Sequence, residues 1–480
     1  MLKKRTKIVC TIGPACEDVQ ILEKMVRAGM NVARLNFSHG TYENHAQLIE
    51  NIRDVSKKTG QPVAILQDLQ GPKIRVGVLP DEGVILEDGK EVIFDTSRKE
   101  YDGSSVPVDY EQLSEFLKPG ERILLSDGKL ETKVIEVNGS QIVTQVVVGG
   151  TIFSHKGMNV PDTILTIRAM TEKDKQDARF GVEHGVDMMA LSFVTKPDDI
   201  LDLRYAIKEF EAELGITDRP PIRIIAKIER QEAVKRIKEI MGVVDGIMVA
   251  RGDLGIEIPA QDVPLVQKKL VDTALEYARP VIVATQMLDS MQENPRPTRA
   301  EVSDVANAVI DHTDAIMLSN ETATGKYPVL TVETMATIVM ETEKSSYDNL
   351  ELSDFANKNT PVDDIISRLS RLLAEQVHAK LILAASLSGE TGRLISRYRP
   401  ELPIAVATGD ERVRHQLNLS WGVLPFILPQ CSSIEELVER SMVYLKKHGY
   451  VKVGDNMIVV AGEPVGHAGH VNLLEVREVK

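Results

Sequence analysis

Residues 223–253 read RIIAKIERQEAVKRIKEIMGVVDGIMVARGD. Two apolar runs rich in β-branched residues, over residues 223–229 and 246–253, enclose an amphipathic segment over residues 233–241. A continuous apolar run predicts a strand that is buried on both faces, and a helix between two such strands predicts a parallel βαβ unit. This stretch therefore indicates an α/β fold.

The same alternation continues on both sides of this unit. Further strand-like runs occupy residues 7–12, 31–36, 63–69, 187–193, 280–286 and 314–321. Amphipathic segments with helical periodicity lie between most of the runs, over residues 19–28, 43–59, 172–184, 198–214, 263–277 and 299–311. Eight strand–helix units predict a (β/α)8 TIM barrel with an active site at the C-terminal ends of its strands.

The long interval between the third and fourth runs has a different character. Glycine-containing turn signals and short runs of alternating polar and apolar residues fill it, which is typical of short antiparallel strands. We expect a small all-β barrel domain over residues 72–167, inserted into a catalytic barrel formed by residues 1–71 and 168–345. Its position in a βα loop predicts a lid above the active face.

A second α/β pattern follows the barrel. Strand candidates lie at residues 381–385, 403–408, 423–428, 457–461 and 471–476, with helix candidates at residues 365–377 and 434–448. We therefore expect a separate C-terminal α/β domain, doubly wound, over residues 346–480.

Composition narrows the function classes. The chain has 480 residues and a formal net charge of −14, which argues against nucleic acid or an anionic membrane as a partner because both attract a basic face. The three cysteines match neither a zinc site nor a disulfide framework. No long apolar stretch predicts a membrane span or a signal peptide, and a reduced cytoplasmic setting is expected.

Polar residues gather at the predicted C-terminal ends of the barrel strands, where such a fold builds its active site. Cations and carboxylates together at one mouth suit a phosphorylated acid and a divalent metal ion. The residues concerned are Arg34, Asn36, Ser38, His39, Asp68, Lys73, Arg75, Lys227, Glu229, Arg251, Gly252, Asp253, Thr285, Gln286, Ser319 and Glu321.

Two of these carboxylates, Glu229 and Asp253, are hard oxygen ligands suited to Mg²⁺ or Mn²⁺. Lys227 lies two positions before Glu229, so alternation along a strand places both side chains on one face. The backbone N–H groups of a short helical turn around Gly252 could receive a carboxylate or phosphate.

Each of these features also has an ordinary structural explanation. A Lys-x-Glu pair is more often a surface ion pair, an Arg-Gly-Asp sequence is more often a turn, and buried hydroxyls such as those of Thr285 and Ser319 commonly bond to the backbone. Their joint position at one end of eight strands favours the functional interpretation.

At these residues the sequence resembles the pyruvate kinase family, of bacterial type and of the potassium-independent group. The motifs that carry the resemblance span the predicted barrel. They are KIVCTIGP at 7–14, ARLNFSHG at 33–40, DLQGPKIR at 68–75, AKIE at 226–229, GIMVARGDLGIEIP at 246–259, ATQMLDSM at 284–291, PRPTRAEVSDVANAV at 295–309 and the segment 316–328.

The resemblance implies phosphoryl transfer from phosphoenolpyruvate to ADP, in the last step of glycolysis. Lys227 corresponds to the lysine that steadies the phosphoryl group, and Arg34 to the arginine that grips the phosphate of phosphoenolpyruvate. Glu229 and Asp253 correspond to the ligands of the essential Mg²⁺ or Mn²⁺.

Further roles follow from the same resemblance. Thr285 and the amides of Gly252 and Asp253 correspond to the groups that hold the substrate carboxylate. Thr285, and Ser319 with Glu321 through waters, correspond to candidates for delivering the proton to the enolate carbon. Asn36, Ser38 and Asp68 correspond to monovalent-cation ligands, and His39, Arg75 and Lys156 to groups that bind ADP or ATP.

Two positions depart from the family pattern. Potassium-requiring members carry Glu where this chain has Lys73, and an ammonium group there could replace the monovalent cation by charge. We therefore expect activity without K⁺, although a solvated loop lysine is the alternative.

The second departure lies in the C-terminal domain. The segment with Ser386, Ser388, Gly389 and Thr391 resembles the family's effector phosphate loop, yet Glu390 adds negative charge to it. Residues 462–472 also differ from versions that grip fructose 1,6-bisphosphate. A phosphorylated allosteric activator is expected without a predicted identity, and the family resemblance implies a homotetramer.

Two rival functions share parts of this pattern. A metal-dependent lyase or aldolase of the same barrel superfamily, acting on a 2-keto acid, would use a similar acidic metal site without the inserted lid. A non-catalytic regulatory paralogue would be expected to have lost Lys227, Glu229 or Asp253. Formation of pyruvate that depends on ADP separates these possibilities.

Overall fold

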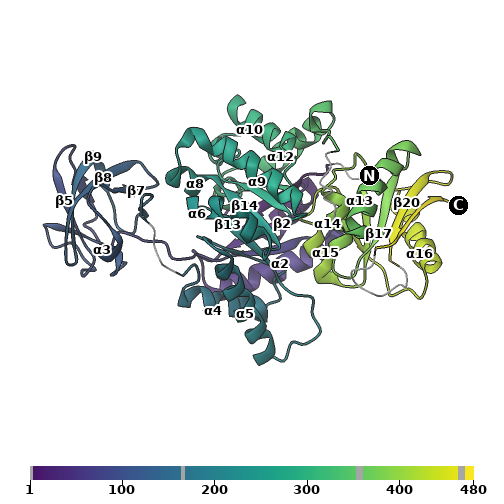
Figure 1. The fold of residues 1–480 in the computed structure, drawn as a ribbon, viewed down its shortest axis with the longest axis horizontal. Helices are drawn as coiled ribbons and strands as arrows, with labels where there is room; N and C mark the ends of the chain where they lie inside the picture. Colours follow the sequence, from purple (N-terminus) through teal and green to yellow (C-terminus); the bar gives the residue numbers. More distant parts are fainter. Residues whose placement is uncertain (1–3, 164–167, 353–360, 463–470) are drawn as a thin grey trace.

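A closed barrel of eight parallel strands forms the middle of the computed structural model, which describes residues 4–163, 168–352, 361–462 and 471–480 (Figure 1). The order around the barrel is β1, β2, β3, β12, β13, β14, β15 and β16, and β16 closes onto β1. This arrangement confirms the predicted (β/α)8 fold. The bounds are β1 Lys7–Thr11, β2 Val32–Asn36, β3 Ala64–Asp68, β12 Met188–Leu191, β13 Arg223–Ile228, β14 Gly246–Ala250, β15 Val281–Ala284 and β16 Ala315–Leu318.

Helices follow the barrel strands in sequence, and two of them begin at capping boxes. The amide of Asp174 donates to the hydroxyl of Thr171 while the amide of Thr171 donates to the carboxylate of Asp174, and Thr298 and Glu301 make the same pair of bonds. The helix predicted over residues 233–241 is split into two at Arg236. The bounds are α1 Val19–Ala28, α2 Tyr42–Thr59, α4 Glu172–Glu183, α5 Pro197–Glu213, α6 Gln231–Lys235, α7 Ile237–Met241, α8 Arg251–Glu257, α9 Val263–Glu276, α10 Arg299–Ile310, α11 Asn320–Ala323 and α12 Pro328–Thr342.

The barrel interior is filled by side chains from alternate strand positions. Val9, Leu66, Met248 and Met317 belong to this interior cluster, and so does Leu419 from the C-terminal domain. A second, larger cluster lies between the strands and the surrounding helices. The packed interior is a core rather than a channel, so the polar residues at the strand ends define the mouth.

The segment from β4 to β11, inserted between β3 and α4, forms a separate body at one end of the long axis (Figure 1). It contains a two-stranded sheet, a six-stranded sheet and one short helix, around a hydrophobic cluster of its own. The predicted β-rich insertion is therefore present. Its elements are β4 Val84–Leu86, β5 Glu91–Asp95, β6 Ser105–Pro107, α3 Leu113–Phe116, β7 Arg122–Leu125, β8 Leu130–Asn138, β9 Gln141–Val148, β10 Gly150–Ile152 and β11 Met158–Asn159.

The C-terminal domain lies at the opposite end (Figure 1) and contains a five-stranded sheet in the order β19, β18, β17, β20 and β21. The first four strands are parallel and β21 is antiparallel to β20. The predicted α/β domain is confirmed. Its elements are α13 Val362–Gln376, β17 Leu381–Ala385, α14 Glu390–Ser396, β18 Ile404–Thr408, α15 Glu411–Leu417, β19 Val423–Ile427, α16 Ile434–Lys447, β20 Asn456–Ala461 and β21 Leu473–Glu478.

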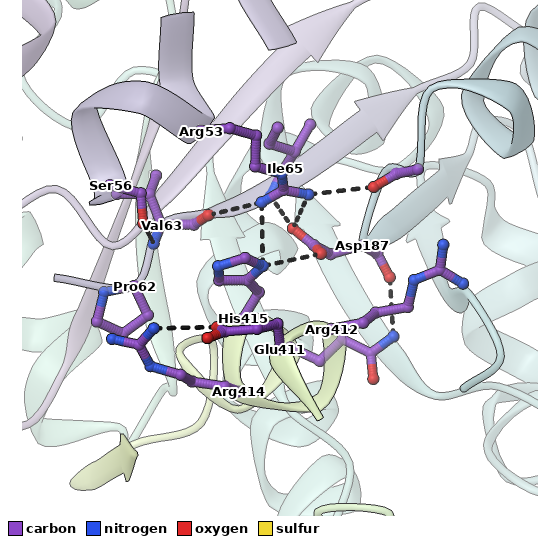
Figure 2. A network of polar contacts seen from close by, with 12 residues as sticks. Arg53, Ser56, Pro62, Val63, Ile65, Asp187, Glu411, Arg412, Arg414 and His415 are labelled. Carbon is purple, nitrogen blue, oxygen red and sulfur yellow. Dashed lines mark hydrogen bonds and ion pairs between the residues drawn. The ribbon is translucent and has the colours of Figure 1, made fainter. Parts of the chain in front are cut away.

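The C-terminal domain packs against the N-terminal ends of the barrel strands, which we call the barrel bottom. Figure 2 shows the centre of this contact, where Asp187, just before β12, meets Arg53 of α2 and His415 of α15. Gln416 donates to the backbone carbonyl of Asp187 at 3.0 Å. The contact leaves the C-terminal ends of the strands free of this domain, so the mouth faces the inserted domain.

Candidate active site

The ammonium group of Lys227 lies at the centre of the mouth. Its Nζ is 2.9 Å from Oε1 of Glu229, 3.3 Å from Oδ1 of Asp68 and 2.7 Å from Oγ of Ser192. Burial lowers the pKa of Lys227, but the charges of Asp68 and Glu229 outweigh it and hold the pKa above its usual value. The lysine is therefore charged at physiological pH.

Arg34 of β2 and Lys227 of β13 meet at Asp68, which lies on the intervening strand β3. The Nε of Arg34 donates to Oδ2 of Asp68 at 2.7 Å, and its NH1 group donates to Oγ1 of Thr11 at 2.9 Å. Burial raises the pKa of Asp68, yet Lys227 and Arg34 together hold it below its usual value. Two cations thus flank one ionised carboxylate, which holds both of them at the mouth.

The two predicted metal ligands form a pair with unequal exposure. Glu229 is buried, with 1% exposure, while the side chain of Asp253 is 29% exposed. Burial raises the pKa of Glu229, the charge of Lys227 opposes this, and the charge of Asp253 adds to it. A pair of oxygen ligands whose mutual repulsion is relieved by a cation fits Mg²⁺ or Mn²⁺.

The remaining ligands of such an ion would have to come from water and substrate. Within the described ranges, no group of three or more His, Cys, Asp and Glu side chains could hold a metal ion. Mg²⁺ is usually bound by one or two carboxylates together with waters and substrate oxygens. The donor set therefore suits a metal ion shared with the substrate.

Gly252 and Thr285 form the next part of the mouth. The amide of Gly252 donates to Oγ1 of Thr285 at 2.8 Å, and a β-carbon on Gly252 would lie only 3.4 Å from that oxygen. Thr285 has a φ of +75°, which is strained for a β-branched residue. Arg251 supports this turn, because it pairs with Asp304 at 2.7 Å and donates to the carbonyl of Thr285.

The end of β16 carries a buried acid. Glu321 is 1% exposed and accepts the amides of Ser319 and Leu288, at 2.7 and 3.2 Å. Burial raises the pKa of Glu321 despite these bonds. A buried carboxyl group whose pKa is raised above its usual value suits a proton-relay position.

The residues predicted to form a monovalent-cation position lie close together. Asn36 and Asp68 are partners in the β2–β3 register, and the side chain of Asn36 accepts the amide of Ser38 at 3.2 Å. Lys73 lies elsewhere, with its Nζ 4.0 Å from Oδ1 of Asp253. Its ammonium group therefore faces a predicted divalent-metal ligand.

The predicted nucleotide contacts are the most dispersed. His39 is exposed after β2, and Lys156 is exposed on the inserted domain. Arg75, in the segment that leads into that domain, donates to the carbonyl of His155 at 3.2 Å. No contact among these three groups joins them into one site in the described part of the chain.

The predicted effector loop lines a cavity of 380 Å³ in the C-terminal domain, together with residues from the ends of β18 and β20. Ser386, Ser388 and Thr391 face this cavity, and Gly389 has a left-handed backbone with a φ of +80°. Most of the other loop that the sequence analysis singled out in this domain, residues 462–472, lies outside the described residues, which omit 463–470.

Three residues of the mouth escaped the sequence analysis. Thr11 at the end of β1 accepts a bond from Arg34, Ser192 accepts a bond from Lys227, and Phe193 donates its amide to Glu229 at 2.7 Å. The runs that contain Thr11 and Ser192 were correctly predicted as strands. Their polar tips could have been included by the same rule that selected Thr285.

A (β/α)8 barrel whose mouth combines a charged lysine, an arginine and two metal-type carboxylates defines a phosphoryl-handling enzyme. A family model described as "Pyruvate kinase, barrel domain" matches residues 3–332, and one described as "Pyruvate kinase, alpha/beta domain" matches residues 364–477. The chain belongs to the pyruvate kinase family and is a phosphotransferase.

Bacterial relatives match over the full length. The chain is 42% identical over 481 residues to the pyruvate kinase of Geobacillus stearothermophilus, covering 100% of this chain and 81% of that protein. It is 41% identical over 479 residues to the pyruvate kinase of Clostridium acetobutylicum, covering 99% of this chain and 100% of that protein. A crystal structure of a pyruvate kinase from Cryptosporidium parvum superposes with a TM-score of 0.92 at 34% identity, covering 100% of this chain and 97% of that one.

No helix in the described part of the chain is both long and apolar enough to cross a bilayer.

Proposed function

We propose that the chain transfers the phosphoryl group of phosphoenolpyruvate to ADP in a reaction that depends on Mg²⁺ or Mn²⁺. The products are pyruvate and ATP, in the last step of glycolysis in the cytoplasm. The proposal rests above all on one observation, the charged ammonium of Lys227 held against Glu229 within reach of the charge of Asp253.

Phosphoryl transfer needs positioning and charge stabilisation more than covalent chemistry. Glu229 and Asp253 would hold the metal ion, which would supply positive charge to stabilise the negative charge that develops in the transfer. Arg34 binds the phosphate of the substrate, and Lys227 donates to the phosphoryl group in flight. Asp68 holds both cations in place, because it contacts each of them.

The three-carbon part of the substrate occupies the turn between β14 and β15. The amides of Gly252 and Asp253 begin a short helix and bind the carboxylate together with Thr285. Loss of the phosphoryl group leaves an enolate that needs a proton on carbon. Thr285, with Ser319 and the buried acid Glu321 through water, delivers that proton.

The nucleotide enters from the side of the inserted domain. Residues 72–167 act as a lid, and its closure brings Lys156 toward the ADP phosphates bound by Arg75 and His39. The lid contacts the barrel at Lys73, whose Nζ lies 4.0 Å from Oδ1 of Asp253. Lid closure also excludes water from the transfer.

Lys73 makes the reaction independent of K⁺. Its ammonium group lies 4.0 Å from Oδ1 of Asp253, so in this proposal it supplies the charge of a monovalent cation from beside the divalent-metal ligands and not from the position of Asn36, Ser38 and Asp68. Equal initial rates in KCl and in a tetramethylammonium salt of the same ionic strength support this role. A strict requirement for KCl contradicts it.

The test of the proposed function is direct. Purified protein is mixed with phosphoenolpyruvate, ADP and Mg²⁺, and pyruvate and ATP are measured together. We expect equal amounts of both products and no reaction without ADP or the metal. Pyruvate released from a 2-keto acid substrate without ADP would instead identify a lyase or aldolase.

Residues 346–480 form a regulatory domain that binds a phosphorylated activator at Ser386, Ser388, Gly389 and Thr391. The support is the cavity at this loop and the loop's contacts with the barrel bottom. Arg223, the first residue of β13, donates to the carbonyl of Ser388 at 3.1 Å, and β13 carries Lys227. A panel of sugar phosphates and AMP, assayed at subsaturating phosphoenolpyruvate, identifies the activator.

The chain assembles as a homotetramer in this proposal. One supporting feature is an apolar stripe on α13, where Val362, Ile365 and Leu369 are 64%, 44% and 43% exposed. Residues at this spacing share one helix face and favour burial against another surface. Light scattering of the purified protein measures its mass directly, and a monomer at micromolar concentration would contradict the assembly.

A further inference from the structure

Ser192 follows β12 and is 1% exposed, although it carries a hydroxyl group. Its Oγ donates to the carbonyl of Leu69 at 2.7 Å and accepts a bond from Nζ of Lys227 at 2.7 Å. A hydroxyl group has one hydrogen to donate. Because that hydrogen is committed to Leu69, the lone pairs of Ser192 are directed at the ammonium of Lys227.

The other two partners of this ammonium group are carboxylates. The ammonium donates a hydrogen bond to Ser192 and forms ion pairs with Glu229 and Asp68, at 2.9 and 3.3 Å. A divalent metal ion at Glu229 would compete with the ammonium for that carboxylate. The ammonium could then turn an N–H toward a phosphoryl oxygen while its bond to Ser192 keeps it in place.

A neutral acceptor has a specific advantage at this position. A third carboxylate would attract the ammonium more strongly and compete with the phosphoryl group for its charge. A hydroxyl oxygen fixes the direction of the ammonium with little loss of its positive field. Ser192 therefore orients Lys227 without neutralising it.

The next residue holds the partner carboxylate. Phe193 has a φ of +56° and donates its amide to Oε2 of Glu229 at 2.7 Å. Positive φ is unfavourable for a non-glycine residue and usually persists only where the surroundings enforce it. Gly71 packs on this corner, since a β-carbon there would lie 2.9 Å from Cβ of Ser192 and 2.8 Å from the ring of Phe193.

We propose that Ser192 is a positioning residue that aims the ammonium of Lys227 at the migrating phosphoryl group, with the amide of Phe193 fixing Glu229 beside it. This inference rests on the proposed phosphoryl transfer and extends it to a residue that does not touch the substrate. In this proposal Ser192 and Phe193, which follow β12, set the distance between the ammonium of Lys227 and the proposed metal site.

The test compares two buried serines. In Ser192→Ala we expect kcat to fall by about 10- to 100-fold, as misplacement of a catalytic group by about 1 Å can do, while the KM for ADP and the half-saturating Mg²⁺ concentration change less than about threefold on the same reasoning. Ser56 is the matched control, because it is also buried and also donates to a carbonyl at 2.7 Å, that of Gln61.

Ser56→Ala should lower the melting temperature with kcat unchanged, because Ser56 lies near the barrel bottom (Figure 2). Ser192→Thr keeps the hydroxyl group and should recover most of the lost kcat. A crystal structure of Ser192→Ala gives a readout without turnover, in which Nζ of Lys227 should shift away from its position beside Asp68.

The outcomes are separable. Loss of kcat in Ser192→Ala no greater than in Ser56→Ala, a Ser192→Thr variant as slow as Ser192→Ala, or an unmoved Lys227 in the crystal would each overturn the positioning role. Failure of the unmodified protein to form pyruvate would overturn the proposed function instead, and the crystal comparison would still decide the role of Ser192.

Discussion

Two buried lysines, one at each end of the barrel, differ in the charges around them. Lys7 lies at the barrel bottom, is 2% exposed and donates to the carbonyl of Val423 at 2.7 Å. Burial, with the repulsion of Lys4, lowers the pKa of Lys7 to about 7. At the mouth, burial acts on Lys227 in the same sense, but Asp68 and Glu229 raise its pKa above the usual value.

The comparison shows that burial does not decide whether a barrel lysine is charged. The decisive difference is two carboxylates within 3.3 Å of Lys227 against a neutral carbonyl for Lys7. The carboxylates of the two ends also differ. Asp187 at the bottom is bonded to Arg53, His415 and the amide of Ile65 (Figure 2), and although burial raises its pKa, these partners hold it below the usual value.

Glu229 at the mouth has a raised pKa, because burial and Asp253 outweigh Lys227. In the network around Asp187 at the barrel bottom, the charge of the carboxylate is thus fully compensated, and the network joins two domains. At the mouth the charge of Glu229 is incompletely compensated, which favours a divalent ion beside it.

The largest expected effect is on kcat, when each of the two lysines is replaced by methionine in turn. Lys227→Met should lower kcat by about 10³-fold, because it removes a cation from the developing charge, with circular dichroism unchanged. Lys7→Met should retain kcat. Comparable loss of turnover in the two variants would end the distinction between the two ends of the barrel.

Asp187→Asn tests the contribution of the network around Asp187 to stability. It leaves Arg53 and His415 without their buried carboxylate, which should cost about 3 kcal/mol of unfolding free energy, measured by urea denaturation at pH 7.5. The folded enzyme should keep its kcat. Because the pKa of Asp187 is depressed, the unmodified protein should lose this stability as the pH falls through that pKa, and the variant should lack that part of the acid dependence.

Glu229→Gln probes the proposed metal site at the mouth. The amide removes a metal ligand while preserving shape, so the Mn²⁺ concentration for half-maximal rate should rise by about 10²-fold. Glu257→Gln, which changes another buried acid of the same barrel that pairs with Arg230, is the control. An unchanged Mn²⁺ requirement in Glu229→Gln would remove that residue from the metal site.

The smallest effect concerns pH and Lys7. Its depressed pKa means that the unfolded chain binds more protons between pH 7 and the ordinary lysine range, so this group makes the protein more stable as the pH rises through that window. Lys7→Met should flatten that rise in stability. Melting temperatures of both proteins between pH 6 and pH 10 measure it, and parallel curves would contradict the assignment.

Much of the barrel could be predicted because each buried strand is a continuous apolar run in the sequence. All eight predicted runs contain a barrel strand. The helix over residues 233–241 was predicted as one, but the chain breaks at Arg236, which adopts a non-helical conformation. Helix α12 was not predicted, since its sequence VLTVETMATIVMET has apolar and β-branched residues on more than one face.

The site was predictable where several charged residues follow strands. Lys227, Glu229 and Asp253 could be grouped because parallel strands place their C-terminal ends together. Ser192 could have been included by the rule that selected Thr285, whereas Phe193 could not be singled out, because it acts through its backbone amide and an aromatic side chain after a strand carries no signal for that. The direction of Lys73 toward Asp253 depends on the segment that leads into the inserted domain, and sequence periodicity does not determine that path.

The most direct measurement is a crystal soaked in Mn²⁺ and phosphoenolpyruvate, examined by anomalous diffraction. The account predicts one manganese peak within bonding distance of both Glu229 and Asp253, with the ammonium of Lys227 turned from Glu229 to the phosphate and still bonded to Ser192. A peak remote from these carboxylates, or a Lys227–Glu229 contact that persists beside bound substrate, would contradict it.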